Sequence, residues 1–438
     1  MAGMTGGSEP SAPGDLRRFF SFLDEGRLPA ALEALIEGYI QVKTGKPFGD
    51  PMVLARLRRA IVAQKRVYWR SGTDRSISYR SGYSVLAYLA YQFPVYYFQS
   101  CRILGQMASR GELAGEIRAV DLGTGPGVIP LALITLARYL PGFSAGVLAV
   151  EPSAEHREAF DYLVNGFTEP GDTVRVRSVL AADARTVPDE QIPAGIDLLV
   201  LSNVLNELPG DAATRSRFVM RWLTHLGEEG TALLVEPADL RNSTALREVQ
   251  RELVREGFHV HHPCRSVWGS TCGPVPCWSF EEAPPVRETR LQEALAAGSL
   301  EPFRYRNTDI KFSSAVLRRA PPPRIPCQGL DRRRLSPLSQ LPRHLGRRIA
   351  CLASVMSGEL GDYRSHVRKL CDGTARSPVF AVLPAFHVTP ENRAVLDAPY
   401  GTVLHLRGVL VRRNPRTRAF NLLVSRVSTA APCREQQL

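Results

Sequence analysis

Residues 117–127 read IRAVDLGTGPG, an apolar run that ends in an acid and leads into a turn with three glycines. Residues 128–140 follow with the apolar character of a helix. Glycine suits such a turn because the backbone must change direction sharply between strand and helix, and because a ligand can approach it closely. The spacing is G-x-G-x-G, whereas a dinucleotide-binding turn more often reads G-x-G-x-x-G. An ordinary tight turn would also fit, so the interpretation depends on the segments that follow.

Further apolar runs end in polar residues. They cover residues 145–150 before Glu151, 174–180 before Asp183, 196–201 before the segment SNVLNEL at 202–208, and 231–235 before Glu236. Helical segments separate these runs, which predicts a parallel, doubly wound α/β sheet with its binding site at the carboxyl ends of the strands. Over about 114–318, the order and spacing resemble the class I (Rossmann-like) S-adenosylmethionine-dependent methyltransferases.

The strand ends also predict which residues bind a nucleoside cofactor. An acid at the end of the second strand can accept hydrogen bonds from both ribose hydroxyls, which is the role we expect for Glu151. Asp183, after the third strand, could reach an adenine amine. With the glycine turn, the predicted cofactor-binding residues are Asp121, Gly123, Gly125, Gly127, Glu151 and Asp183.

The composition predicts a globular protein of more than one domain. At 438 residues the chain is too long for one ordinary core, and 44% hydrophobic with 22% charged residues is typical of a globular chain. No apolar run is long enough to span a bilayer. The first 14 residues are rich in Gly, Ser and Pro and predict a disordered tail (1–14) without a targeting signal. We therefore expect the protein in the cytoplasm, or in the mitochondrial matrix if the source is eukaryotic. Separately, we expect a monomer.

The net charge of +12 is unevenly distributed. Residues 311–438 contain 22 Lys and Arg against 7 Asp and Glu, a balance of +15, whereas the first 310 residues contain 33 against 36, a balance of −3. Positive charge concentrated in one third of the chain predicts a polyanionic partner. A GC-rich coding sequence, which raises the Arg content, is the alternative explanation.

The first three quarters of the chain divide into two regions. Residues 15–113 read as a helical domain, within which 79–104 is dense in aromatic residues that either pack in a core or stack on RNA. Residues 114–318 form the methyltransferase-like domain, because 311–317 reads as its last strand. The cysteine-rich segment 263–280 is then an insertion in that domain.

Beyond residue 318 the chain is basic. Residues 319–362 are rich in Pro and Arg and predict a linker or an RNA-bound arm. Residues 363–438 are a basic C-terminal region in which 402–411 and 420–427 read as the two strands of a β-hairpin. Such a hairpin is typical of a small barrel-like module.

Three of the eight cysteines, Cys264, Cys272 and Cys277, lie within 14 residues. In a long chain without a secretion signal, clustered cysteines favour a metal site over disulfides. As the fourth ligand we expect Cys371, because the basic stretch around it would stabilise a thiolate. Cys327 is the second choice.

The identity of the metal stays open at this stage. His261 or His262 could complete a zinc site. The spacing lacks the C-x-x-C pairs typical of zinc ribbons, so irregular all-cysteine ligation favours a [4Fe-4S] cluster, with zinc as the alternative. Unligated buried cysteines would also fit.

Several motifs together resemble one family. They are YLAYQFPVYY at 88–97, DLGTGPG at 121–127, NVLNEL at 203–208, VEP at 235–237, CWSF at 277–280 and KLCDG at 369–373. The combination resembles the methyltransferase-like assembly factors of the mitochondrial small ribosomal subunit and their bacterial and archaeal relatives, over most of 75–430. The resemblance implies binding to small-subunit rRNA during assembly, an S-adenosylmethionine pocket and an iron–sulfur cluster with four cysteine ligands. The gap of 93 residues between Cys277 and Cys371 is longer than we expect for this family.

Two functions from different classes follow. The first is an S-adenosylmethionine-dependent methyltransferase acting on small-subunit rRNA. A sulfonium methyl is already activated, so catalysis needs mainly positioning and a strong base is optional. Asn203, Asn206 and Glu207 are the candidate catalytic residues, although a structural role fits them equally well. The second is a non-catalytic RNA-binding assembly factor on a methyltransferase scaffold, and a nicotinamide-dependent oxidoreductase is a third possibility.

Overall fold

The structure is a computed structural model that describes residues 13–68, 82–264, 267–268, 272, 276–323 and 330–433. Most of the predicted tail, residues 79–81 of the aromatic stretch, part of the cysteine-rich segment and Cys327 lie outside these ranges. The chain divides into two compact units: the first is Met1–Pro209, Arg221–Thr231 and Ala283–Ile310, and the second is Gly210–Met220, Ala232–Glu282 and Lys311–Leu438. Within the described ranges, no helix is both long enough and apolar enough to cross a bilayer.

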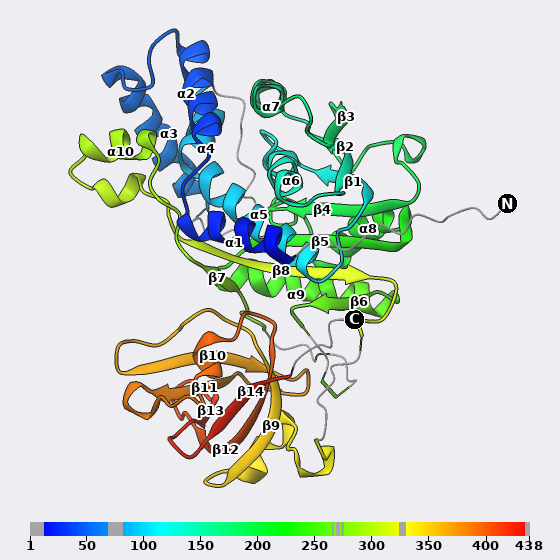
Figure 1. Cartoon of the computed structure of the whole chain (residues 1–438), viewed down its shortest axis with the longest axis vertical. Coiled ribbons are helices and arrows are strands. Elements are labelled where there is room, and N and C mark those ends of the chain that lie inside the picture. The colour runs from blue at the N-terminus through cyan, green and yellow to red at the C-terminus, as the bar shows by residue number, and fades with distance from the viewer. Residues whose placement is uncertain are drawn as a thin grey trace, which may run out of the picture. The chain divides into compact units, whose positions relative to one another are not determined.

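The N-terminal part is helical. Its helices are α1 (Pro13–Glu25), α2 (Ala30–Thr44), α3 (Pro51–Tyr68), α4 (Ser84–Tyr91) and α5 (Phe93–Ser109), drawn in blue to cyan in Figure 1. In α2 the buried Leu32, Ile36 and Ile40 recur every four residues, which places them on one face. The helix ends where Gly45 takes the left-handed conformation and donates its N–H to the Gln41 carbonyl over 2.8 Å.

The aromatic stretch is largely core. Phe93 and Tyr97 are fully buried, Phe98 is almost so, and the rings of Phe93 and Tyr97 stack with their centroids 6.2 Å apart. The Tyr97 hydroxyl lies 2.7 Å from Thr135 Oγ1, which satisfies its hydrogen bond inside the protein. A ring without exposed surface cannot receive a base, so for these residues the core interpretation holds and RNA stacking does not.

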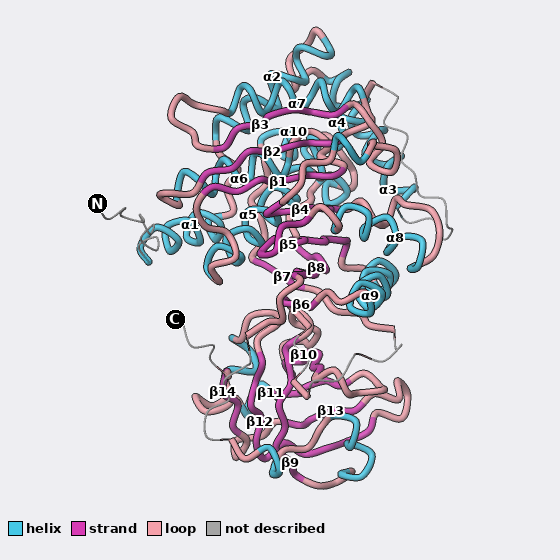
Figure 2. The backbone as a smooth tube through the Cα atoms, turned by 90° about the vertical axis from the view of Figure 1, so that its right-hand side faces the viewer, coloured by secondary structure: helices cyan, strands magenta, loops and turns pink. Residues whose placement is uncertain are grey.

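The first sheet is doubly wound. Its strands are β1 (Glu116–Leu122), β2 (Ser144–Val150), β3 (Val174–Leu180), β4 (Ile196–Ser202), β5 (Leu226–Pro237), β6 (His259–His262), β7 (Glu281–Ala283) and β8 (Ile310–Arg318). Their order is β3-β2-β1-β4-β5-β8-β6, with β7 on β8. β1 pairs in parallel with β2 and β4, and β2 pairs in parallel with β3, whereas β6 is antiparallel to β8. Figure 2 shows β3, β2, β1 and β4 side by side in this order. The predicted parallel sheet is confirmed.

Helices alternate with these strands. They are α6 (Val128–Tyr139), α7 (Ala154–Phe167), α8 (Ala212–Leu223), α9 (Leu240–Arg255) and α10 (Arg290–Ala297). Because helices cover parallel strands, a central strand is a continuous apolar run rather than an alternating one. β4 follows this rule, since Leu198, Leu199, Val200 and Leu201 are all fully buried.

The C-terminal module contains the second sheet. Its strands are β9 (Arg348–Val355), β10 (Ser365–Cys371), β11 (Val379–Pro384), β12 (Val403–Arg413), β13 (Phe420–Leu423) and β14 (Thr429–Pro432). The order is β13-β11-β10-β9-β12-β14, and β13 also pairs with β12, so the sheet closes on itself. Ala381, Leu404 and Leu406 are fully buried in its interior. The predicted hairpin and the barrel-like module are confirmed, since β12 and β13 are antiparallel neighbours.

Shorter helical segments complete the fold. They are η1 (Asp189–Gln191), η2 (Pro302–Tyr305), η3 (Arg332–Arg334), η4 (Leu338–His344), η5 (Ala385–His387) and α11 (Ala394–Asp397).

The linker predicted for residues 319–362 is wrong over Arg348–Val355, which forms β9. Ile349, Cys351, Ala353 and Val355 alternate along this strand and face the core of the module. β9 also pairs with a neighbour on each side, β10 and β12. The Pro and Arg residues that flank the strand dominate the composition, and so they conceal this short alternation.

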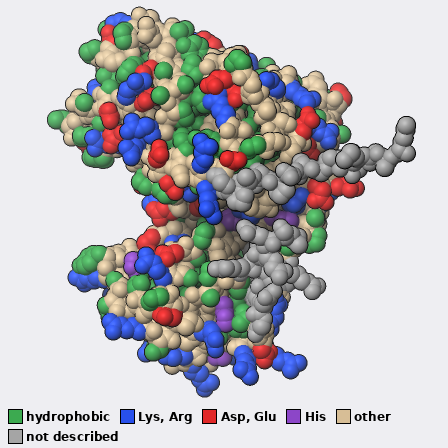
Figure 3. Space-filling view, viewed as in Figure 1, with side chains coloured by type: hydrophobic (Ala, Val, Ile, Leu, Met, Phe, Trp, Pro, Cys, Tyr) green, Lys and Arg blue, Asp and Glu red, His purple; other side chains and the backbone are tan. Residues whose placement is uncertain are grey.

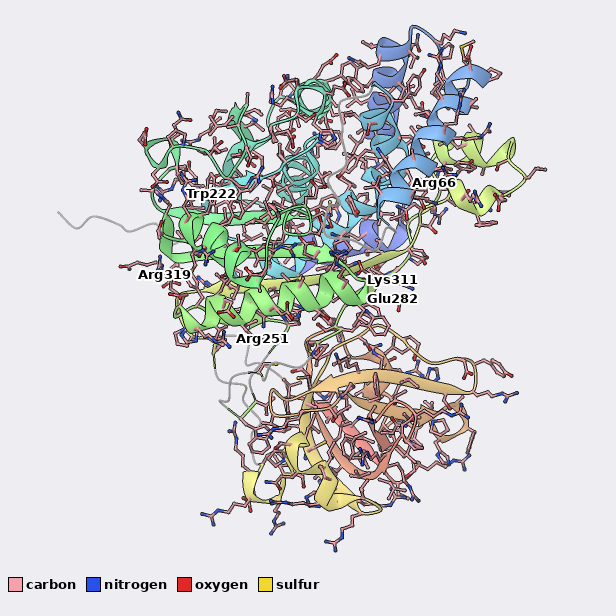
Figure 4. All side chains as sticks on the ribbon, turned by 180° about the vertical axis from the view of Figure 1, so that it is seen from behind. Arg66, Trp222, Arg251, Glu282, Lys311 and Arg319 are labelled. Carbon is pink, nitrogen blue, oxygen red and sulfur yellow. The ribbon has the colours of Figure 1, made fainter. Side chains whose placement is uncertain are left out.

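Within the second unit, an ion pair links β7 to β8. Lys311 Nζ lies 3.0 Å from Glu282 Oε1, and Figure 4 shows the two side chains together on neighbouring strands. The other oxygen of Glu282 accepts the backbone N–H of Glu359 over 3.1 Å. Phe280 N–H donates to the Met356 carbonyl over 3.3 Å. The end of the cysteine-rich segment is thus bonded to the C-terminal module.

Candidate functional site

The glycine turn lies between β1 and α6. Gly123, Gly125 and Gly127 have φ values of 67°, 55° and 90°, which favour glycine. A Cβ on Gly123 would lie 2.8 Å from Val204 Cγ2, and one on Gly127 would lie 2.7 Å from Val164 Cγ2. A Cβ on Gly125 would meet no atom within 4 Å. Packing therefore explains two of the glycines, whereas the third borders open space.

Glu151 lies beside this turn, as predicted. The side chain is buried, with 5% exposed. Its Oε2 accepts the Gly125 N–H over 2.9 Å, and its Oε1 accepts the Ser153 N–H over 2.8 Å. His156 Nδ1 is 3.7 Å from Oε1. These contacts join the carboxyl ends of β1 and β2 into one surface.

Acidic groups cluster around Glu151. Burial, with the charge of Glu151, raises the pKa of Asp121 to about 7. Burial of the carboxyl group, with the charge of Glu151, likewise raises the pKa of Glu207 to about 7. Glu207 as a whole is an exposed residue. Its raised pKa therefore reflects the surroundings of the carboxyl group and not burial of the whole side chain. Asp121 Oδ2 is buried and has no hydrogen-bond partner among the described residues.

Two further side chains belong to this site and are absent from the predicted site residues. Burial raises the pKa of Tyr88, with added repulsion from Tyr96, Glu207, Glu151 and Asp121, so its hydroxyl lies near all three acids. The His156 ring packs edge-on against Tyr88, with centroids 5.7 Å apart. Tyr88 begins the motif YLAYQFPVYY, which is the signal that could have identified it.

The segment after β4 contains the candidate catalytic residues. Asn203 has a φ of 58°, which is uncommon for a residue other than glycine, and its buried Oδ1 has no hydrogen-bond partner in the described part of the chain. The neighbouring Val204 borders Gly123, so this segment adjoins the glycine turn. Asn206 is partly exposed. Of the three candidates, Asn203 therefore lies in the segment that adjoins the glycine turn, and Glu207 lies near Glu151.

Asp183 follows β3 but is engaged elsewhere. Arg185 Nε lies 2.9 Å from Asp183 Oδ1, and the Arg185 N–H donates to the same oxygen over 2.9 Å. The side chain of Arg185 lowers the pKa of Asp183, which is the behaviour of a carboxylate in an ion pair. The predicted contact of Asp183 with an adenine amine would compete with this ion pair.

The second unit brings the predicted cysteines together. Burial raises the pKa of Cys371, and Cys277, Cys264 and Cys272 raise it further. Cys264 and Cys277 likewise raise the pKa of Cys272 after burial. Thiols affect one another in this way only when they are near. The structure therefore gathers the four cysteines, although 93 residues separate Cys277 from Cys371.

Two buried cations face these thiols. Arg247 is 2% exposed, and its three hydrogen bonds go to neutral atoms: Ser279 Oγ at 3.0 Å, Gln250 Oε1 at 2.5 Å and Tyr400 Oη at 3.0 Å. Lys369 is 7% exposed.

Lys369 Nζ donates to Cys277 Sγ over 3.5 Å and to the Trp278 carbonyl over 2.5 Å. Burial raises the pKa of the Cys277 thiol, but Lys369 and Arg247 outweigh it, so this pKa lies below its ordinary value. Buried charges are normally paired, and the described contacts of the two cations include no carboxylate. The cations therefore favour thiolate at this site.

The four thiols do not have the arrangement of a metal site. Among the described residues, no three His, Cys, Asp or Glu side chains are arranged as they would be around a metal ion. His261 Nε2, one of the alternative zinc ligands, lies 2.9 Å from the Ala320 carbonyl, and the His262 ring packs against Tyr400. The second-choice ligand, Cys327, lies outside the described residues. The pKa effects place the four thiols near one another, but their spacing in the structure is not that of metal ligands.

The fold and the first site define a class of protein. The strand order 3-2-1-4-5, the last strand inserted antiparallel, the glycine turn after β1 and the acid after β2 are the features of the class I S-adenosylmethionine-dependent methyltransferase fold. Residues 82–277 match the model of a family described as mitochondrial small ribosomal subunit Rsm22. The resemblance noted in the sequence is confirmed over that part of the chain. Residues 339–433 match a second model, described as the C-terminal domain of a domain of unknown function (DUF8157). No curated protein matches the chain.

Solved structures resemble the chain at low identity. Magnesium protoporphyrin IX methyltransferase from Synechocystis is 11% identical, covering 61% of this chain and 99% of its own, with a TM-score of 0.32. Precorrin 8w decarboxylase from Methanobacterium thermoautotrophicum is 18% identical, covering 50% and 86%, with a TM-score of 0.29. An S-adenosylmethionine-dependent methyltransferase from Clostridium acetobutylicum is 17% identical and covers 32% of this chain, which spans 51% of that protein, with a TM-score of 0.26. The fold assignment therefore rests on the strand order and pairing given above.

Proposed function

We propose that this protein binds S-adenosylmethionine at the glycine turn and acts on, or binds, small-subunit rRNA during ribosome assembly. The observation that carries the cofactor assignment is the hydrogen bond from Gly125 N–H to Glu151, which joins the ends of β1 and β2. The family match over 82–277 supports the ribosomal assignment. Asp121, Gly123 and Gly127 complete the proposed site, and Asp183 would join it only after leaving Arg185.

The charge of the site favours S-adenosylmethionine over a nicotinamide dinucleotide. Glu151 lies close enough to raise the pKa values of Asp121 and Glu207, and neither of these two acids has an ion pair with Lys or Arg among the described residues. A pyrophosphate would be repelled by these acids. A ligand with a sulfonium and an ammonium group would be attracted to them.

Both the enzyme and the binding factor are compatible with this site. In an enzyme, S-adenosylmethionine supplies the activated methyl group, so the chain must mainly orient the acceptor. Asn203 could accept a hydrogen bond from an acceptor amine, and Glu207, with a pKa of about 7, could hold a proton there. The sequence after β4 reads Asn-Val-Leu-Asn and not the Asn-Pro-Pro-aromatic motif that holds exocyclic base amines. Because that motif is absent, a non-catalytic assembly factor is the second candidate function.

The four-cysteine site is proposed to hold a [4Fe-4S] cluster, with zinc as the alternative. Cys264, Cys272, Cys277 and Cys371 would be the ligands. Four thiolates give either centre a net negative charge, which the buried Arg247 and Lys369 would balance. The role we propose is structural, because the metal would tie the inserted segment to the end of β10.

The experiment that tests the proposal maps RNA contacts and methyl marks in cells. The protein is crosslinked to RNA, the bound RNA is sequenced, and rRNA methylation is compared between wild type and Gly125→Arg. We expect crosslinks in small-subunit rRNA. Loss of one methyl mark in the variant would identify an enzyme, whereas unchanged marks with normal assembly would identify a binding factor. Failure to recover small-subunit rRNA would refute the ribosomal assignment.

A further inference from the structure

The order in which the strands of the C-terminal module pair identifies the type of barrel. β9, β10 and β11 form an antiparallel meander, β13 pairs in parallel with β11 and antiparallel with β12, and β12 pairs antiparallel with β9. The ring therefore runs β9-β10-β11-β13-β12 and returns to β9, with the short helix α11 between β11 and β12. Counted along the module, the order is 1-2-3-5-4-1, which is the closure of an OB-fold barrel.

OB-fold barrels bind oligonucleotides with the face of strands 2 and 3 and with the loops that join strands 1–2 and 4–5. In this chain those loops are β9–β10 and β12–β13. A fold alone does not make a site, so the side chains on the two loops decide the question.

The end of β12 and the β12–β13 loop carry arginines that have no acidic partner among the described residues. Arg412, Arg413, Arg416 and Arg418 are exposed, and none of them has an ion pair with an acid among the residues that the structure describes. The loop has a fixed shape, because Asn414 Oδ1 accepts the Arg416 N–H over 3.0 Å and Asn414 N–H donates to the Ala419 carbonyl over 2.8 Å. Figure 3 shows many basic and few acidic side chains on the visible face of this module. A loop of fixed shape with exposed arginines can bind the phosphate groups of a nucleic acid.

The other loop and the segment after β11 each carry an exposed aromatic side chain. Tyr363, at the end of the β9–β10 loop, is 80% exposed, and Phe386, just after β11, is 69% exposed. The Arg364 guanidinium lies 5.2 Å from the centre of the Tyr363 ring, and Arg426, after β13, donates to the Phe386 carbonyl over 3.0 Å. We call Tyr363, Arg364, Phe386 and Arg426 the aromatic rim.

The segments of the aromatic rim are joined by the backbone. Ala385 N–H donates to the Arg364 carbonyl over 2.9 Å, which brings the start of β10 next to the end of β11. The adjacent acid, Asp362, uses one carboxylate oxygen to accept the N–H groups of Arg364 and Ser365 over 2.8 and 3.0 Å. Its carboxylate thus shapes the turn.

We propose that the C-terminal module binds an unpaired stretch of RNA, with bases stacked on Tyr363 and Phe386 and phosphates on the arginines of the β12–β13 loop. The inference rests on the proposed rRNA binding and names its surface. Arginine side chains alone would bind any polyanion. Exposed aromatic rings select single strands, because a base must be unpaired for its face to stack on a side chain.

The test uses the full chain and fluorescence anisotropy. The probes are a labelled single-stranded RNA of mixed sequence and a duplex with the same number of phosphates. Stacking on an aromatic side chain contributes about 1–3 kcal/mol per base, or roughly 5- to 150-fold in affinity. Tyr363→Ala with Phe386→Ala should weaken single-strand binding at least about 10-fold and leave duplex binding within about twofold. Trp at both positions should restore the affinity.

Two control variants separate stacking from charge. Phe303→Ala removes a phenyl ring of equal exposure, 69%, from the first unit and should change neither affinity. Arg416→Gln with Arg418→Gln should weaken both RNAs and lower the salt slope for the single strand by about 0.7 per lost phosphate contact. Equal single-strand affinity in wild type and the double alanine variant would overturn the inference, as would tighter duplex binding by wild type. A wild type that binds neither RNA would instead refute the proposed rRNA binding, and the inference with it.

Discussion

Gly125 donates its backbone N–H to Oε2 of Glu151 over 2.9 Å, so the turn after β1 and the end of β2 form one binding surface. The same Gly125 borders space in which a Cβ would meet no atom within 4 Å. A nucleoside held by the Glu151 carboxylate would occupy the space beside Gly125. A side chain at this position should therefore compete directly with the cofactor.

We expect Gly125→Arg to abolish S-adenosylmethionine binding measured by calorimetry. Gly111→Arg is the matched control, because Gly111 also has a positive φ, of 73°, and also has no neighbour within 4 Å of its Cβ position. Both substitutions impose the same kind of backbone strain, about 1–2 kcal/mol. Only the first should remove the binding heat. Equal affinity in the two variants would place the cofactor elsewhere, and tighter binding of NAD than of S-adenosylmethionine would refute the class of ligand.

The acids predict a pH dependence of stability. The folded protein raises the pKa of Asp121 and of Glu207 to about 7, from ordinary values of 3.8 and 4.5. Between about pH 4 and pH 7 the folded state therefore binds more protons than the unfolded chain, so the free energy of unfolding falls as the pH rises through this window. Thermal melting should give a lower Tm at pH 7.5 than at pH 5. Asp121→Asn should reduce this difference, whereas Asp161→Asn, an exposed acid on α7, should not.

The same acids predict that cofactor affinity moves in the opposite direction. Ionised Asp121 and Glu207 attract a sulfonium, so S-adenosylmethionine affinity should rise roughly 3- to 10-fold between pH 5.5 and pH 7.5. Calorimetry in buffers of different ionisation enthalpy should detect proton release on binding below pH 7. The rise should be smaller in Glu207→Gln. An affinity that falls with rising pH would mean that the acids do not face the positive group.

The strand ends of the first sheet could be predicted from the sequence, but their side-chain partners could not. Glu151 lies beside the glycine turn because both follow strands of a parallel sheet, and that geometry follows from the order of apolar runs. Asp183 follows the same rule, yet Arg185, only two residues away, holds its carboxylate. Tyr88 comes from a helix outside the sheet, and no periodicity indicates which face of that helix meets the acids.

The cysteine site shows the same limit. The cluster of Cys264, Cys272 and Cys277 could be read from spacing, whereas the approach of Cys371 depends on how the C-terminal module folds. The buried Arg247 could not be foreseen, because an arginine on an amphipathic helix normally faces solvent. β9 was hidden for a related reason, since four alternating residues carry little weight in a stretch rich in Pro and Arg.

Cys371→Ser should release the metal, and Cys351→Ser should not. Both cysteines lie in strands of the C-terminal module, but Cys351 is fully buried in its core and Cys371 lies among the other three thiols. Protein purified without oxygen should be brown and contain roughly four irons per cluster. Iron content and visible absorption should fall in the variants of Cys264, Cys272, Cys277 and Cys371. Stoichiometric zinc would favour the alternative metal, and metal loss in Cys327→Ser but not in Cys371→Ser would identify a different fourth ligand.

Lys369→Met should change stability in opposite directions with and without the metal. In metal-loaded protein the buried ammonium would balance thiolate charge, so its removal should lower the free energy of unfolding by about 3–5 kcal/mol. In reduced, metal-free protein the ammonium is a buried charge without a carboxylate partner, so the variant should be as stable as wild type or more stable. Denaturant unfolding of both forms measures this. Lys311→Met is the control, because Lys311 pairs with Glu282 at a more exposed position and should change both forms alike, by about 1 kcal/mol or less. Equal destabilisation of both forms by Lys369→Met would show that Lys369 acts through packing and not through the charge of the thiolates.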